Sequence, residues 1–261
     1  MIELELGGSR RARVWLGGSR CDDVAVRVSS SWSAQRLAAR RLWTVPFPAK
    51  IWIMSILQFE SVSPPLDQPA LGGAALRTLG RAEAMGLLHG EPPIRQLDTR
   101  VLERVLRRVI RRSGIGRDAA IEISRPHPSA DQFERVLRRV FDELGQSPVP
   151  ATEWRSVLDR LSPDLVTKLV GVSPASVRRY AGGARPTPDA VAERLHFLAL
   201  VTADLAGSYN DFGIRRWFER PRPQLDMRSP AQLLRGEWHA DNEGPQRVRE
   251  LARALTGPLG T

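Results

Sequence analysis

Apolar residues recur at helical spacing on both sides of a glycine in the second half of the chain. Residues 165–170 place four of them on one face, just before Gly171. After the glycine, Val177 and Tyr180 lie three residues apart, which again puts them on one side of a helix. Glycine adopts the left-handed backbone that ends a helix tightly. The pattern predicts two short helices joined by a glycine turn.

The start of the second helix has its own signal. Ser173 is suited to cap the helix, and Pro174 to its first position, where no backbone donor is needed. With Val177 and Tyr180 turned inward, the outward positions are Ser173, Ala175, Ser176, Arg178 and Arg179. This is the helix-turn-helix pattern, so we predict that these five residues bind DNA. The alternative is that the motif serves only as a packing scaffold.

Three earlier stretches, residues 72–88, 101–110 and 133–144, also show helical spacing. The last two contain the same seven residues, Glu-Arg-Val-Leu-Arg-Arg-Val, at 103–109 and 134–140. One interpretation is an arginine-faced helix pair for nucleic acid. We favour the other, two packed amphipathic helices, because arginine stems readily lie along apolar surfaces while their charges stay in water.

Punctuation by proline and glycine suggests the domain organisation. Residues 1–53 show no sustained period, so we expect a disordered segment or a mis-assigned start; the alternative is a tryptophan-rich arm that binds a membrane surface or nucleic acid. A proline-rich stretch at 147–151 marks the main boundary. The expected segments are the N-terminal residues 1–53, a linker-like segment 54–93, an accessory helical segment 94–150, a helix-turn-helix domain 151–206 and a C-terminal domain 207–261.

The second half of the chain reads as helical throughout, and we expect an all-α fold. Four helix starts combine a hydroxyl residue with a proline: Ser162-Pro163, Ser173-Pro174, Thr187-Pro188 and Ser229-Pro230. The helix from Pro188 is apolar over a wide surface, which predicts a central core helix that could also form a dimer contact. We expect His196, within this helix, to occupy a flanking polar position rather than to bind a ligand. Further helices are predicted at 214–219, 230–235 and 245–255.

The composition of the chain excludes several kinds of site and points only weakly to any one function. The net charge is +10, but residues 1–53 contribute 9 basic and 4 acidic residues, half of the excess, so the charge supports a polyanionic partner only weakly. One cysteine permits no internal disulfide, and four dispersed histidines favour no metal site. There is no phosphate-binding loop, nucleophile elbow or dinucleotide motif. We expect a cytoplasmic protein that is not an enzyme, needs no cofactor and binds no membrane.

Residues 213–236 carry a second group of motifs. They contain an aromatic pair, a proline and leucine, and a Ser-Pro helix start with a leucine pair, and an Arg-Val helix follows. With the helix-turn-helix before it, this order resembles the antitoxins of the Xre/MbcA/ParS family over about residues 152–256. The matching residues are Trp217, Phe218, Pro221, Leu225, Arg228, Ser229, Pro230, Leu233, Leu234, Arg247 and Val248.

The resemblance implies an all-α antitoxin, a homodimer or higher oligomer, that inhibits a RES-type, NAD-consuming toxin and represses its operon by binding operator DNA. The toxin-binding residues that follow are Arg216, Trp217, Arg220, Pro221, Arg222, Leu225, Arg228, Ser229, Pro230 and Leu233. Of these we expect the arginines to be exposed, and either Trp217 or Phe218 to be core. The alternative function is a stand-alone helix-turn-helix transcriptional regulator without a toxin.

The sequence departs from the family pattern at one turn. Met227 stands where the family usually has glycine, in Asp-Met-Arg-Ser. If the turn needs a positive φ, methionine costs roughly 1–2 kcal/mol there.

Overall fold

The computed structural model describes residues 2–6, 10–14, 55–123 and 129–255, and the chain divides into two compact units, residues 1–51 and 52–261. In the first unit, β1 (Ile2–Leu6) and β2 (Arg10–Val14) pair antiparallel, with Ile2 opposite Val14. These two strands lie in the segment 1–53, for which we expected disorder or a mis-assigned start. The four tryptophans of that segment lie outside the described residues.

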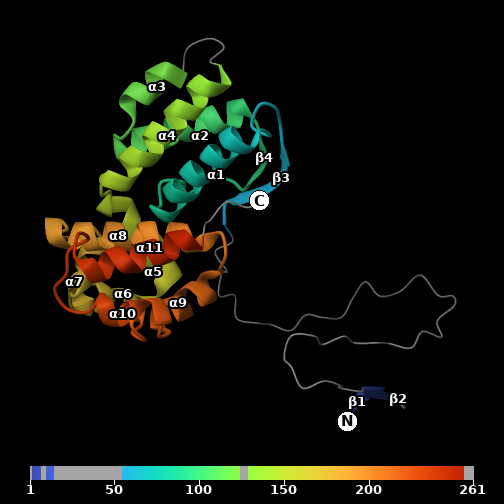
Figure 1. Cartoon of the computed structure of the whole chain (residues 1–261), viewed down its shortest axis with the longest axis vertical. Coiled ribbons are helices and arrows are strands. Elements are labelled where there is room, and N and C mark those ends of the chain that lie inside the picture. Colours follow the sequence, from blue (N-terminus) through green and yellow to red (C-terminus); the bar gives the residue numbers. More distant parts are fainter. Residues whose placement is uncertain (1, 7–9, 15–54, 124–128, 256–261) are drawn as a thin grey trace. The chain divides into compact units, whose positions relative to one another are not determined.

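The second unit is mostly helical, as predicted, with a small sheet that was not (Figure 1). Its strands are β3 (Leu57–Val62) and β4 (Ile94–Leu97), and a 3-10 helix, η1, spans Pro223–Leu225. Its α-helices are α1 (Pro69–Ala84), α2 (Thr99–Ser113), α3 (Arg117–Ile123), α4 (Ala130–Gln146), α5 (Pro150–Leu161), α6 (Pro163–Val170), α7 (Pro174–Ala181), α8 (Asp189–Ala206), α9 (Asp211–Glu219), α10 (Pro230–Leu233) and α11 (Glu243–Ala254).

The segment 54–93, expected to be linker-like, is an integral part of this unit. β3 and β4 pair in parallel, and α1 connects them. Helix α1 packs against α4, α5 and α8, and Leu79 and Ala82 are fully buried. The prediction failed because the glycines and prolines were taken for a flexible composition. At Gly72 the absence of a side chain instead permits close packing, since a Cβ there would overlap the carbonyl oxygen of Leu66.

The repeated heptapeptide builds two helices of the same kind. In α2 and α4 its three apolar residues are buried, and its glutamate forms an ion pair with the arginine four residues later. Asp98 caps α2 by accepting from Val101 N, and Ser129 and Gln132 form a capping box on α4. The packing interpretation of these helices is confirmed.

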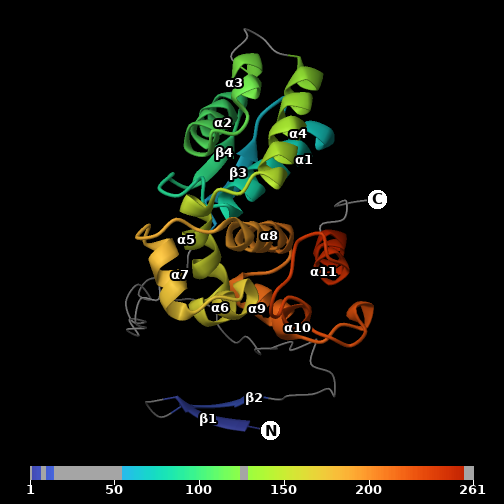
Figure 2. The ribbon, with the colours of Figure 1, turned by 90° about the vertical axis from the view of Figure 1, so that its left-hand side faces the viewer.

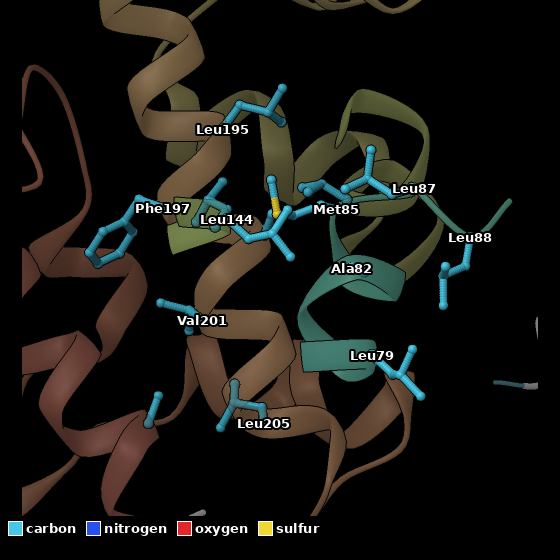
Figure 3. Close-up of a cluster of buried hydrophobic side chains, with 14 of the residues drawn as sticks. Leu79, Ala82, Met85, Leu87, Leu88, Leu144, Leu195, Phe197, Val201 and Leu205 are labelled. Atoms are coloured by element: carbon cyan, nitrogen blue, oxygen red, sulfur yellow. The ribbon is translucent and has the colours of Figure 1, made fainter. Parts of the chain in front are cut away.

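Helix α8 is the centre of the unit. Twelve of its residues are buried, and it packs against α1, α5, α6, α9 and α11. Figure 3 shows Met85 and Leu144 of the first half beside Leu195 and Val201 of α8. The chain therefore does not divide at residues 147–151, where a domain boundary was predicted. The wide apolar surface of α8 is covered within the chain, so it requires no dimer contact.

Candidate nucleic-acid and partner interfaces

Helices α6 and α7 and the turn between them have the predicted local structure. Gly171 takes the left-handed conformation (φ 74°, ψ 34°) and ends α6 by donating its N–H to Thr167 O. The hydroxyl of Ser173 then accepts from the N–H of Ser176 at 3.2 Å, and α7 begins with Pro174 in its first turn. The turn is thus determined by residues within it.

The inner face of α7 is held against α5 (Figure 2). Val177 is buried, and the Tyr180 ring stacks on the Trp154 ring with centroids 6.0 Å apart and planes 23° apart. Trp154 is itself fixed, because its Nε1–H donates to Thr187 Oγ1 at 2.9 Å. The orientation of α7 therefore depends on a residue of α5 and on the loop that precedes α8.

The outer face of α7 gathers the five predicted DNA-binding residues. Ser173, Ala175, Arg178 and Arg179 are exposed, and Ser176 is half-buried. Within the described part of the chain, the side chains of Arg178 and Arg179 have no hydrogen-bond or ion-pair partner. Residues 163–189 carry four basic and two acidic side chains. Two unpaired guanidinium groups on a short, capped helix suit contacts with phosphates or guanine edges.

Two residues that sequence reasoning missed hold the end of α6. The buried Arg194 of α8 donates from Nε to Trp238 O at 2.8 Å and from its NH1 group to Val170 O at 3.1 Å. Trp238 donates from Nε1 to Leu169 O at 2.9 Å. These bonds satisfy carbonyls at the C-terminus of α6, which have no partners within the helix. The only sequence signal was an arginine within an apolar helical pattern.

The predicted toxin-binding residues separate into three groups. Arg216, Arg220, Pro221 and Arg228 are exposed, and Arg222 and Leu233 are half-buried. The buried residues are Trp217, Leu225, Ser229 and Pro230. Their side chains pack inside the chain, so this conformation does not present them to a partner, and their role as toxin contacts stays a prediction. Trp217 and Phe218, of which one was expected in the core, are both there, edge to face at 5.3 Å.

The loop from Arg222 to Arg228 is closed by its own backbone. Arg222 N donates to Arg228 O, and Met227 N donates to Arg222 O, both at 3.0 Å. Asp226 (φ 55°) and Met227 (φ 59°) are consecutive residues with positive φ, so the strain expected for methionine at this turn applies, roughly 1–2 kcal/mol. Arg247 donates to the Asp226 carboxylate at 2.7 Å, and this hydrogen bond lowers the pKa of Asp226.

An exposed aromatic residue at the start of α9 was also missed. The Phe212 side chain, on the first turn of α9, is 55% exposed, and the Arg216 guanidinium lies 5.7 Å from its ring centre. Spacing alone did not reveal it, since a single apolar residue outside a helical stripe has no pattern. Exposed aromatic and arginine side chains are typical of protein contacts.

Charged groups inside the unit serve packing. His196, expected at a flanking polar position, is buried, and its Nδ1 lies 2.6 Å from Glu153 Oε1. Arg81 of α1 donates to Phe141 O at 2.8 Å, and its guanidinium carbon lies 3.4 Å from the centre of the Phe141 ring. Burial and the neighbouring Arg249 lower the pKa of Arg81 to about 10. The other ring nitrogen of His196, Nε2, lies 3.2 Å from Gly145 O, so His196 links α8 to the end of α4 and thereby joins the two halves of the unit.

A small cleft of about 70 Å³ lies between the end of α1 and α5, where Glu83 faces Arg160 at 3.5 Å. Among the described residues, no three potential metal-ligating side chains cluster together. No helix in the described ranges is both long and apolar enough to cross a membrane.

Comparison of the chain with protein-family models, with curated proteins and with solved structures gave no match.

Proposed function

We propose that this chain is a DNA-binding antitoxin, which represses its own operon through α7 and inhibits a RES-type, NAD-consuming toxin through its C-terminal segment. The observation that supports DNA binding best is the outer face of α7. Arg178 and Arg179 are exposed and unpaired within the described residues, while the opposite face is clamped by Trp154 and Tyr180. A rigid helix with free guanidinium groups loses little conformational entropy on binding.

The toxin part of the proposal rests on the resemblance of residues 152–256 and on the exposed arginines Arg216, Arg220 and Arg228. A stand-alone transcriptional regulator is the second candidate. The burial of Trp217, Leu225, Ser229 and Pro230 favours it, because four of the ten residues expected to touch a toxin serve the core instead. A RES-domain reading frame beside this gene favours the antitoxin, and its absence favours the regulator.

DNA binding is tested with the full chain and the DNA upstream of its own gene, by fluorescence anisotropy at several salt concentrations. We expect the double variant R178A/R179A to raise the Kd at least about tenfold, since a good arginine–base contact contributes roughly 1–3 kcal/mol. The matched control is R104A/R111A, which removes the same charge from exposed positions on α2. It separates the α7 face from general electrostatic attraction.

Sequence-specific binding that survives in R178A/R179A would refute the assignment to α7. Equal losses in both double variants would show a diffuse electrostatic contact instead. For the toxin, the tagged full chain is co-purified with the adjacent RES-domain product. A stable complex that is lost in R220A/R228A supports the antitoxin, and its absence leaves the regulator.

A further inference from the structure

The loop between Arg222 and Arg228 presents an apolar side chain where both backbone and solvent disfavour it. Met227 has a positive φ, which a residue with a Cβ rarely adopts, and its side chain is 67% exposed. Asparagine or glycine would fit the turn without strain. Strained conformations that persist at the surface are enriched at binding sites. The methionine side chain therefore makes no evident contribution to the stability of the fold at this position.

The surroundings hold the strained conformation in place. The bridge between Arg222 and Arg228 closes the loop, and Leu225 is buried beneath it. Arg247 fixes the loop from α11, donating to the Asp226 carboxylate and to Gln224 O at 2.9 Å. Because the backbone is fixed from three sides, the Met227 side chain is presented on a preordered platform, which reduces the entropy lost on binding.

Charge determines the kind of surface that fits. The one carboxylate in the loop from Arg222 to Arg228, that of Asp226, already forms an ion pair with Arg247. The side chains of Arg228, next to Met227, and of Arg220, just before the loop, are exposed, and neither has a hydrogen-bond or ion-pair partner among the described residues. The exposed apolar side chain of Met227 is thus flanked by the cationic side chains of Arg220 and Arg228. A complementary surface is an apolar pocket with acidic residues at its rim.

We propose that Met227 is an apolar anchor that inserts into an acid-rimmed apolar pocket of the partner toxin. This inference rests on the proposed function and adds to it the residue that makes the central contact. A methionine suits such a role because its unbranched, polarizable side chain adapts to pockets of irregular shape.

The test compares three substitutions in the full chain, with the adjacent RES-domain protein as the probe. M227L keeps an apolar side chain and the strain, M227N removes the apolar side chain at a position where asparagine is tolerated, and M227G removes both the side chain and the strain. Kd is measured by isothermal titration, and the Tm of the free chain by circular dichroism. The control L76N changes another exposed apolar residue, on α1.

We expect M227L and L76N to bind within about threefold of the wild type. We expect M227N and M227G to raise the Kd at least about tenfold while the Tm stays equal or rises. Misfolding of a variant cannot explain a weaker affinity for the toxin when the Tm of the free chain has risen. Wild-type affinity in M227N, or an equal loss in L76N, overturns the anchor. Failure of the wild-type chain to bind overturns the proposed function itself.

Discussion

Gly86 offers a direct test of whether the first half of the unit folds together with the second. It follows α1 with a φ of 74°, in the turn that leads toward β4. A Cβ at this position would overlap the carbonyl oxygen of Thr152 in α5 and lie 3.0 Å from its carbonyl carbon. The substitution G86A therefore forces apart two backbone segments that are 66 residues apart in sequence.

The expected loss has two parts. Alanine at a left-handed position costs roughly 1–2 kcal/mol. The overlap with a backbone atom, which cannot rotate away, adds an overpacking cost of roughly 1–3 kcal/mol. Together they lower the free energy of unfolding by about 2–5 kcal/mol. At roughly 2–4 °C per kcal/mol for a domain of this size, the Tm falls by at least about 4 °C.

The measurement is thermal and urea unfolding of the full chain, followed by far-UV circular dichroism and by tryptophan fluorescence, which includes Trp154 on α5. The control is G80A in the middle of α1, where a Cβ meets no atom within 4 Å and the backbone is helical. It should stabilise the chain by roughly 0.5–1 kcal/mol. An unchanged Tm in G86A, or a shift in only one of two separate transitions, would refute the single shared core.

Two further predictions concern particular bonds. The hydrogen bond from Arg247 lowers the pKa of Asp226 below its ordinary 3.8, so the pair stabilises the fold at neutral pH and this contribution is lost as the pH falls through the lowered pKa. The variant D226N removes the negative charge, and asparagine tolerates the positive φ at this position. It should lower the Tm at pH 7, and its Tm should equal that of the wild type in strong acid. A difference in Tm that persists in strong acid contradicts the charge argument. W154F removes the donor to Thr187 and should cost roughly 1–2 kcal/mol in urea unfolding, while T187V should add little to it in the double variant; additive losses would show that the bond is not shared.

The turn between α6 and α7 was predictable because each of its determinants is local. Gly171 supplies the left-handed residue, Ser173 caps the next helix, and Pro174 occupies its first turn. None of these depends on a contact distant in sequence. The apolar faces of α2 and α4 were predictable for the same reason, since a helix of known period determines which residues share a face.

The dipeptides of serine or threonine with proline did not predict side-chain caps correctly where the hydroxyl group or the backbone depends on contacts distant in sequence. Ser162 and Thr187 precede prolines just as Ser173 does, yet neither caps a helix with its side chain. Ser162 has a φ of 74°, and the hydroxyl of Thr187 accepts instead from Trp154 of α5. The dipeptide locates the start of the helix. It does not determine which donor its oxygen meets, because that depends on the tertiary fold.

The misjudged segment 54–93 has a related cause. The many glycines and prolines of this segment favoured a linker, but at Gly72 and Gly86 a Cβ would overlap a backbone carbonyl oxygen. A glycine needed for close packing and a glycine in a flexible linker are identical in a single sequence. Only the neighbour on the other side distinguishes them, and for Gly86 that neighbour is Thr152, far along the chain.

The candidate partner surface shows a further limit of reasoning from motifs. Most residues that carry the antitoxin resemblance are buried: Trp217, Phe218, Leu225, Ser229, Pro230, Leu234 and Val248. A motif built from buried residues specifies how a segment packs, and it says little about which side chains face a partner. Two motif positions, Pro221 and Arg228, are exposed, and the other exposed candidates lie between the motif positions or differ from the family pattern. Phe212 precedes the aromatic pair, and Met227 replaces the usual glycine. The sequence marked Met227 as unusual, but only the structure shows that both side chains are exposed, which makes them candidates for a partner contact.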